Sequence, residues 1–296
     1  MGSIKVCNIN SSCLVDGSAF PIFGVSDPEM PEDNTIIFAK KGLCNYANLK
    51  NSIIISDKTL DVNESNCLII DDNPKNRFAE ILSKLKENME DYQMYDDGCN
   101  CISKDFKLGE NSAIGRNCII EGDVLIGNNC IIGDYVKICA HTRIGKNVII
   151  NNRCTIGIED ADIYRRGGEL EECLTLPHLA GTIIGDGCLL LDGATVSAGD
   201  TRATTIDNGT MLGIGAHIGH NCIIGKRSLI GAFSCISGHC NIGKDVYVAP
   251  NSVVSNRLNV GDEAYIGIGS VVISDVGEGE KVFGNPALKL PKYTAK

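Results

Sequence analysis

The chain has 296 residues, 43% of them hydrophobic, and a formal net charge of −10. Because no basic stripe offsets this acidity, the sequence predicts no nucleic-acid partner. No stretch approaches the roughly 18 consecutive apolar residues of a membrane-spanning helix, so no membrane span is predicted either.

The first part of the chain has no long period. Two short apolar runs, at residues 53–55 and 67–70, predict buried strands. An acidic turn ending at Pro74 then precedes apolar residues at helical spacing, among them Phe78, Ile81 and Leu82. These patterns predict a small α/β domain over residues 1–100.

From Leu108 onward, a large aliphatic residue stands at every sixth position in two long runs. A small residue often follows four places later, and glycine often follows directly. A period of six is neither helical nor the alternation of a simple strand, but it is the hexapeptide repeat of a parallel β-helix. The two runs are Leu108, Ile114, Ile120, Ile126, Ile132, Ile138, Ile144, Ile150 and Ile156, and then Ile206, Leu212, Ile218, Ile224, Ile230, Ile236, Ile242, Val248, Val254, Val260, Ile266 and Val272.

Each hexad supplies one strand and one turn, with the aliphatic and the small residue pointing inward. Three hexads make one triangular coil, and coils stack about 4.8 Å apart. The sequence thus predicts a mainly β fold with a β-helix over residues 101–276 and a tail over residues 277–296. Repeats of this kind resemble those of left-handed β-helix proteins, which implies left-handed coils. The period breaks at residues 158–182 and slips again at 198–205, and the first break predicts a loop that carries function.

The chain contains 15 cysteines, but their spacing does not indicate a disulfide framework. Several of them occupy the small inward position of the hexad, where a thiol packs as a small buried side chain. Free thiols in this number fit a reducing compartment, and the first residues contain no apolar signal core. We therefore expect a cytoplasmic protein. The inward cysteines are Cys118, Cys130, Cys154, Cys188, Cys222 and Cys240.

Two of the five histidines lie in turns of the second run. His220 follows Ile218 by two residues and His239 follows Ile236 by three, so both should lie on one edge, about one coil apart. Such a ridge offers two groups suited to acid–base chemistry. The alternative is a pair of solvated turn histidines.

The segment Ile-Gly-His-Asn-Cys-Ile-Ile-Gly at residues 218–225 resembles the catalytic-histidine segment of the UDP-3-O-acylglucosamine N-acyltransferase family. The predicted α/β domain and the Leu-Pro pair at residues 176–177 are also similar, and the resemblance covers roughly residues 30–290. It implies acyl transfer to the amino group of a nucleotide-linked sugar, with Phe38 and Tyr46 contacting the base. The resemblance also implies a homotrimer.

Near its end the chain reads Gly-Asn-Pro-Ala at residues 284–287, which is similar to the tails of hexapeptide transferases that use coenzyme A. The chain also departs from the lipid A family, with Arg257 where a second functional histidine is expected and Ile214 where an asparagine is expected. These departures and the tail together favour acyl-CoA as cosubstrate, no bound cofactor, and an acceptor such as a dTDP-4-amino-4,6-dideoxyhexose. The residues expected to contact coenzyme A are Gly238, Asn285, Pro286 and Lys289.

In the implied reaction, the sugar amine attacks the thioester carbonyl and His220 accepts the amine proton. The turn amide near Gly238 or the side chain of His239 stabilises the oxyanion. His220 and His239 are therefore the predicted catalytic residues, and no metal is expected.

Several alternatives stay open. One is the lipid A enzyme UDP-3-O-acylglucosamine N-acyltransferase, which would use acyl carrier protein. Another is a coenzyme A-dependent O-acetyltransferase. A third is a silent β-helix scaffold. A zinc hydratase would need three converging histidines, for which His141, His217 and His220 show no convincing spacing.

Overall fold

The computed structural model describes residues 24–39, 46–87, 94–96, 98–161, 163–164 and 174–289. They fall into two compact units. The first takes its described residues from Met1–Asp91, Ala161–Ala180 and Asp200–Arg202, and the second takes them from Tyr92–Asp160, Gly181–Gly199 and Ala203–Lys296. Most of the predicted loop at residues 158–182 thus belongs to the first unit, although the chain enters and leaves it from the second.

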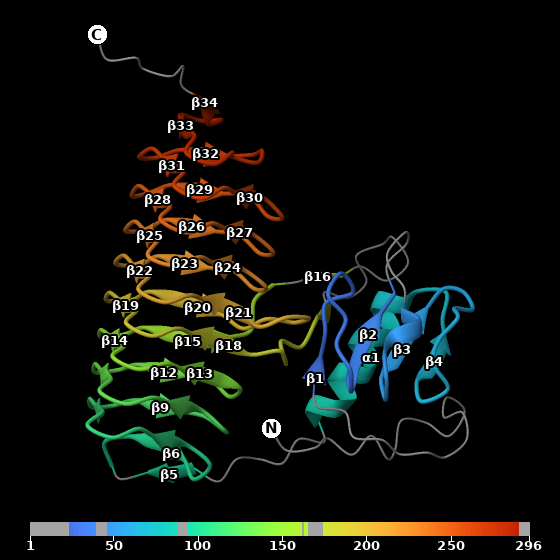
Figure 1. Cartoon of the computed structure of the whole chain (residues 1–296). Coiled ribbons are helices and arrows are strands. Elements are labelled where there is room, and N and C mark those ends of the chain that lie inside the picture. Colours follow the sequence, from blue (N-terminus) through green and yellow to red (C-terminus); the bar gives the residue numbers. More distant parts are fainter. Residues whose placement is uncertain are drawn as a thin grey trace. The chain divides into compact units, whose positions relative to one another are not determined.

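The first unit is a four-stranded parallel sheet in the order β1 (Gly24–Val25), β2 (Thr35–Phe38), β3 (Ile53–Ser56) and β4 (Cys67–Ile70) (Figure 1). The helix α1 (Pro74–Glu87) follows β4 and buries Phe78 and Ile81 against one sheet face. The strands predicted at residues 53–55 and 67–70 and the helix opening at Pro74 are confirmed. The unit also contains the 3-10 turn η1 (Tyr46–Asn48) and an antiparallel pair, β16 (Ile163–Tyr164) and β17 (Leu174–Thr175).

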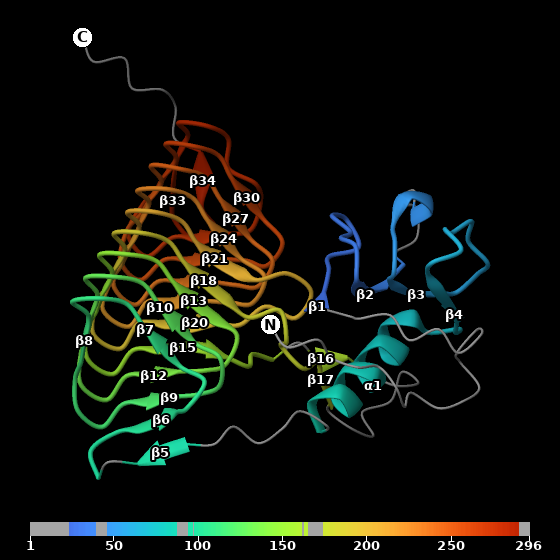
Figure 2. The same ribbon diagram turned by 60° about the horizontal axis from the view of Figure 1, so that its bottom comes forward.

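The second unit is the predicted parallel β-helix, and its strands form three long faces (Figures 1 and 2). Face A has eight strands: β7 (Lys107–Leu108), β10 (Leu125–Ile126), β13 (Thr142–Ile144), β18 (Thr182–Ile184), β21 (Thr204–Ile206), β24 (Ile223–Ile224), β27 (Asn241–Ile242) and β30 (Asn259–Val260). Face B has ten: β8 (Ala113–Ile114), β11 (Ile131–Ile132), β14 (Ile149–Ile150), β19 (Leu189–Leu190), β22 (Met211–Leu212), β25 (Leu229–Ile230), β28 (Tyr247–Val248), β31 (Tyr265–Ile266), β33 (Lys281–Phe283) and β34 (Leu288–Lys289). Face C also has ten: β5 (Met94–Asp96), β6 (Cys101–Ser103), β9 (Ile119–Ile120), β12 (Lys137–Ile138), β15 (Thr155–Ile158), β20 (Thr195–Ser197), β23 (His217–Ile218), β26 (Cys235–Ile236), β29 (Val253–Val254) and β32 (Val271–Val272).

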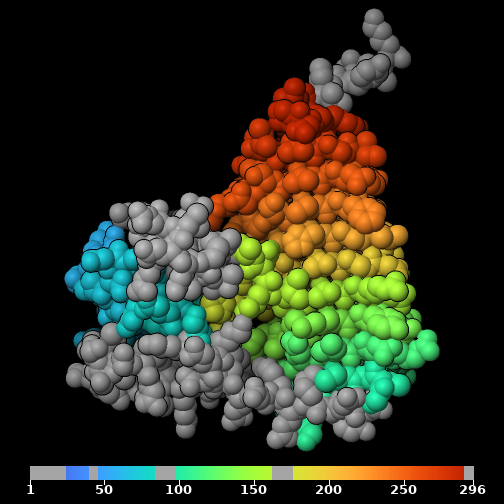
Figure 3. Space-filling view, turned by 180° about the vertical axis from the view of Figure 1, so that it is seen from behind, coloured from blue at the N-terminus to red at the C-terminus, as the bar shows by residue number. Residues whose placement is uncertain are grey.

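The ends of the β-helix reach beyond the predicted residues 101–276. Strand β5 pairs with β6 although it precedes residue 100, and β33 and β34 of the predicted tail join face B. In the space-filling view, the coils form one continuous wall from green to red (Figure 3). Leu108, expected to point inward, is 42% exposed, because its strand β7 is the first of face A and has no coil beneath it.

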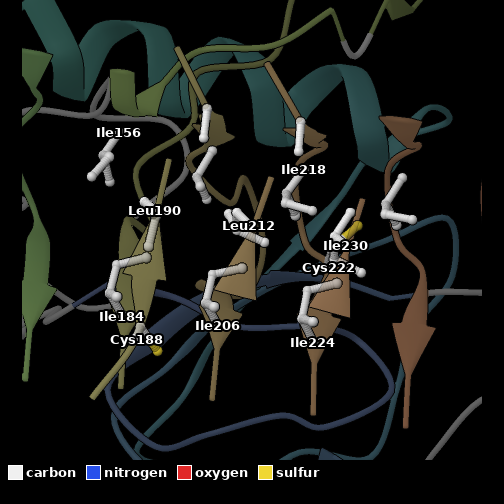
Figure 4. Packing of buried hydrophobic residues seen from close by; sticks show 14 of the residues in the cluster. Ile156, Ile184, Cys188, Leu190, Ile206, Leu212, Ile218, Cys222, Ile224 and Ile230 are labelled. Carbon is white, nitrogen blue, oxygen red and sulfur yellow. The ribbon is translucent and has the colours of Figure 1, made fainter. Parts of the chain in front are cut away.

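The interior of the β-helix is a stack of aliphatic side chains, as the period of six predicts. Ile218, Ile224 and Ile230 are completely buried, and in Figure 4 the labelled side chains project into the space between the strands. Each layer is covered by an aliphatic side chain of the next coil, as Leu212 is by Ile230. Stability is therefore spread along the stack as contacts between neighbouring coils.

The inward cysteines also make a polar contact that the sequence did not indicate. The sulfur of Cys118 lies 3.2 Å from the carbonyl oxygen of Gly133, at the same corner of the next coil. A serine at the same place in the repeat does likewise, since Ser228 donates to the carbonyl of Gly243 at 2.7 Å. Cysteine and serine are thus alternatives for one small donor position, with the thiol as the weaker donor.

Candidate active site

The insertions and the candidate histidines occupy one corner of the β-helix. In regular stretches, equivalent residues of neighbouring coils are 18 positions apart in the sequence. The equivalent residues Lys146 and Asp186 are 40 positions apart, and Asp186 and Asn208 are 22 apart. The extra residues lie between β15 and β18 and between β20 and β21, which are both passages from face C to face A. We call this edge the C–A corner. The chain therefore leaves the regular coil twice at the same edge.

His220 and His239 lie at the C–A corner in adjacent coils. His220 follows β23 and His239 follows β26, and the amide of His239 donates to the carbonyl of His220 at 2.8 Å. The two rings are perpendicular, with centroids 5.0 Å apart. The structure thus brings the two predicted catalytic residues together on one ridge, and their catalytic role stays a prediction.

The two histidines occupy different positions of the repeat. His239 has φ +63°, the left-handed turn conformation that Asn221 adopts in the preceding coil at +56°. The side-chain nitrogen of Asn221 lies 3.4 Å from the ring nitrogens of His239. His220 stands one position earlier, where the next coil has Gly238.

Gly238 leaves the space in which the ring of His220 lies. A Cβ atom at Gly238 would come within 2.6 Å of both Cε1 and Nε2 of His220. The amides of Ser237 and His239 donate to carbonyls of neighbouring coils, whereas that of Gly238 has no acceptor among the described residues. A glycine amide beside the Nε2 edge of a histidine is a suitable donor for a developing oxyanion.

Asp160 orients His220, and the sequence reading missed it. Its Oδ2 atom lies 3.3 Å from Nδ1 of His220, 3.2 Å from the hydroxyl of Ser197, and 3.9 Å from Nε2 of His217. Asp160 comes two residues after the end of β15, at the point where the chain leaves the C–A corner. An acidic residue at the base of an insertion from a histidine-bearing corner is the signal that was available in the sequence.

The charge of Asp160 also affects the nearest thiol. Cys235 stands beside His217 on face C, and its pKa is raised, mainly by desolvation on burial and further by Asp160, while a hydrogen bond with Ser237 opposes the rise. A thiol with a raised pKa carries little thiolate at neutral pH and is a poor nucleophile. The site therefore favours base chemistry at His220 over a cysteine intermediate.

The residues predicted to hold the nucleotide base are not brought together. Phe38 is half-buried against Phe78, with ring centroids 5.2 Å apart on the helix side of the sheet. Tyr46 is 2% exposed and belongs to the separate cluster on the opposite sheet face, with Ile37 and Ile54. The two rings thus belong to clusters on opposite faces of the sheet, and their contact with the nucleotide base stays a prediction.

The residues predicted to contact coenzyme A, apart from Gly238, lie at the end of the β-helix. Asn285 and Pro286 are exposed between β33 and β34, and the ammonium group of Lys289 pairs with Glu280. These residues extend face B and do not join the histidines of the C–A corner. Their contact with coenzyme A remains a prediction.

His141, one of the three histidines considered for zinc, belongs to a different cluster. Its Nδ1 lies 3.1 Å from Asp123, whose other oxygen is 2.6 Å from Arg143. His141 therefore does not converge with His217 and His220, which both face Asp160.

The comparison with protein families identifies the repeat. The model of the bacterial transferase hexapeptide (six repeats) matches residues 106–140, 123–157 and 203–238. These parts of the β-helix are thus similar to the hexapeptides of this transferase family, and the predicted resemblance to hexapeptide-repeat acyltransferases is confirmed. No helix among the described residues is both long and apolar enough to span a membrane.

Several individual proteins similar to this chain are named acyltransferases. An acyl-(acyl-carrier-protein)–UDP-N-acetylglucosamine O-acyltransferase of Rickettsia bellii is 30% identical over 126 residues, covering 42% of this chain and 41% of its own length. A UDP-3-O-acylglucosamine N-acyltransferase of Coxiella burnetii is 25% identical over 209 residues, covering 63% and 59%. The crystal structure of UDP-N-acetylglucosamine O-acyltransferase from Moraxella catarrhalis superposes with a TM-score of 0.59 at 25% identity, covering 64% of this chain and 72% of that one. The chain spans about half the length of the curated relatives that it matches.

Proposed function

We propose that this protein transfers an acyl group from a thioester to a nucleotide-linked sugar, with His220 as the general base. The observation that carries the proposal is the Asp160–His220 pair, 3.3 Å apart, beside the unsubstituted Gly238 at the C–A corner. The names of the relatives support the substrate class, because both curated acyltransferases act on UDP-linked glucosamine derivatives.

The geometry indicates how the proton would move. When Nδ1 of His220 donates to Asp160, the neutral imidazole carries its lone pair on Nε2. Nε2 then takes a proton from the acceptor amine or hydroxyl as that group attacks the thioester carbonyl. The carbonyl oxygen becomes an oxyanion, which the amide of Gly238 or the ring of His239 would stabilise. Collapse breaks the carbon–sulfur bond, and the leaving thiolate recovers the proton from His220.

The acceptor group in our proposal is an amine. The N-acyltransferase of Coxiella burnetii matches 63% of this chain, against 42% for the O-acyltransferase of Rickettsia bellii. A dTDP-4-amino-4,6-dideoxyhexose is the acceptor that the sequence favours. The higher identity of the O-acyltransferase, 30% against 25%, makes a sugar hydroxyl the second candidate.

The donor is proposed as a phosphopantetheine thioester, and two carriers are to be compared. The segment at residues 284–287 suggests acyl-CoA, whereas the name of the O-acyltransferase relative contains acyl carrier protein. Both carriers present the same thioester to His220. We also propose a homotrimer, to be measured by light scattering on the purified chain.

The test is mass spectrometry of products from a matrix of donors and acceptors. The donors are acetyl-CoA, 3-hydroxybutyryl-CoA and 3-hydroxyacyl-ACP. The acceptors are UDP-N-acetylglucosamine, UDP-3-O-acylglucosamine, and UDP- and dTDP-linked aminosugars. An acylated nucleotide sugar that is formed by the protein and lost with His220→Ala supports the proposal. Wild-type turnover that His220→Ala leaves unchanged would remove His220 as the base, and no product in any combination would remove the proposed reaction.

A further inference from the structure

Ser197 is a buried hydroxyl directed at the candidate base pair. It is the last residue of β20, is completely buried, and donates from Oγ to Oδ2 of Asp160 at 3.2 Å. The same oxygen faces Nδ1 of His220 at 3.3 Å. One carboxylate oxygen therefore receives a hydrogen bond from each side.

The backbone around Ser197 is fixed by an irregularity of the sheet. Strands β15 and β20 shift register between Ile156 and Ile158, so that Ile158 pairs with Ser197. The amide of Ala198 donates to the carbonyl of Ile158 at 2.8 Å, and the hydroxyl of Thr182 donates to the carbonyl of Ser197 at 3.4 Å. The position from which Ser197 reaches Asp160 is thus set by the β-helix itself.

The fold does not require a hydroxyl at this position. Ser197 directly follows the inward Val196, and its counterpart in the next coil is Gly219, which follows Ile218 in the paired strand. A residue without a side chain therefore satisfies the repeat there. What the hydroxyl of Ser197 adds at this position is the hydrogen bond to Asp160.

The hydrogen bond from Ser197 matters because Asp160 lies near two histidines. The Oδ2 atom of Asp160 lies 3.3 Å from Nδ1 of His220 and also 3.9 Å from Nε2 of His217. The carboxylate of an aspartate can rotate about its side-chain bonds and so point toward either ring. A hydroxyl donor to a carboxylate is a charge-assisted hydrogen bond, which holds a geometry better than a neutral one.

We propose that Ser197 is a positioning residue that turns Asp160 toward His220 and so holds the tautomer with the proton on Nδ1. This inference rests on the proposed function, since it assigns His220 the role of base. In the free protein, Ser197 acts through its hydrogen bond to Asp160. It sets which nitrogen of His220 carries the lone pair before any substrate binds.

The experiment compares Ser197→Ala with Ser234→Ala as a matched control. Ser234 is also buried and also donates a single hydrogen bond, but its acceptor is the carbonyl of Ala249 and not Asp160. The first readout is the nitrogen NMR spectrum of ¹⁵N-histidine-labelled protein without substrate, with the signals assigned through His220→Gln and His217→Gln. We expect Ser197→Ala to shift the His220 signals away from a single Nδ1-protonated tautomer, and Ser234→Ala to leave them unchanged.

The second readout is kinetic and uses whichever donor and acceptor are turned over. We expect kcat to fall about tenfold in Ser197→Ala with little change in KM, as befits the loss of one hydrogen bond to a charged group. Ser197→Thr, which keeps the hydroxyl, should recover most of the loss. If Ser197→Ala does not fold, Ser197→Gly replaces it, because glycine is the residue of the next coil.

Unchanged His220 signals in Ser197→Ala, or the same change in Ser234→Ala, would overturn the positioning role. The NMR result needs no turnover. It therefore stands separately from a failure of the proposed reaction, which would appear as absence of product from the wild-type protein.

Discussion

The C–A corner carries an aspartate–histidine pair twice, once before the insertion and once at its base. In the first pair, Asp123 contacts His141 at 3.1 Å and Arg143 at 2.6 Å. In the second, Asp160 contacts His220 at 3.3 Å, together with Ser197 and His217. The residue types and the corner are alike, but the partners of the carboxylate differ.

Arg143 distinguishes the structural pair from the candidate base. The carboxylate of Asp123 is matched by a guanidinium, which stays protonated at every relevant pH. Burial alone would raise the pKa of Asp123, but hydrogen bonds from His141 and Arg143 outweigh it and hold that pKa well below its usual range. Asp160 faces two imidazoles and a hydroxyl, so its charge acts on a histidine that can exchange protons.

Replacing His220 and His141 in turn should give the largest difference in kcat between the two aspartate–histidine pairs. We expect His220→Ala to lower kcat on the order of 10²- to 10⁴-fold, the usual contribution of a general base. His141→Ala should leave kcat within about threefold of the wild-type value, since His141 serves the structural pair. The measurement is product formation by mass spectrometry at saturating substrate. Equal losses in both variants would mean that the corner contributes stability rather than a base.

Changing each aspartate to asparagine should give the next largest contrast. An asparagine at position 160 can present an amide N–H to Nδ1 of His220 and so favour the wrong tautomer. We expect Asp160→Asn to lower kcat on the order of 10²-fold. Asp123→Asn is the matched control and should change kcat little. A normal rate for Asp160→Asn would show that His220 needs no carboxylate partner.

Much of the fold followed from the sequence because the β-helix repeats itself. The period of six fixes which residues point inward, and Ile120, Ile138 and Ile156 are all completely buried as that period predicts. The turn positions of His220 and His239 followed from the same period, and so did their adjacency. The repeat therefore predicted the architecture and, within the candidate site, the positions of His220 and His239.

The rest could not be read from the period because it depends on where the repeat fails. Asp160 contacts His220 beside the insertion, where β15 and β20 shift register and the period is lost. The alternation along β2 places the clusters of Phe38 and Tyr46 on opposite sheet faces, and the contact of either ring with a nucleotide base stays a prediction. The contact of Asp160 with His220 and the packing of Phe38 against Phe78 both join segments far apart in the sequence.

Adding a methyl group at Gly238 should test the space beside the candidate base. The backbone of Gly238 is not left-handed, so alanine meets no strain there, but its Cβ would lie 2.6 Å from Nε2 of His220. We expect Gly238→Ala to displace the ring and lower kcat about 10-fold or more, with an unchanged melting temperature within about 2 °C. In the His220→Ala background the same substitution should have little further effect on kcat, since the ring it displaces is gone. Additive losses would place the effect of Gly238 elsewhere than at His220.

The smallest expected effect is on stability, at Asp123. Asp123→Asn should reduce the free energy of unfolding by about 1–3 kcal/mol at pH 7, the range for hydrogen bonds to a charged group in a partly buried site. Asparagine can still accept the hydrogen bond that the amide of His141 donates to Asp123 at 2.8 Å, so the loss reports mainly on the contacts with Arg143 and the ring of His141. Urea denaturation of the two proteins, followed by circular dichroism, measures the difference.

The pH dependence of that difference follows from the direction of the pKa shift. The pKa of Asp123 is lower in the folded protein than in the unfolded chain, where an aspartate titrates near about 3.9. Its contribution to stability is therefore fully present above the unfolded value and is lost as the pH falls toward the folded value. The advantage of the wild-type protein over Asp123→Asn should stay constant between about pH 6 and 8 and shrink only below about pH 4. A difference in stability that instead changed between pH 6 and 8 would show that protonation of His141, and not the charge of Asp123, governs the pair. The Asp123–His141 pair and the Asp160–His220 pair would then be chemically alike.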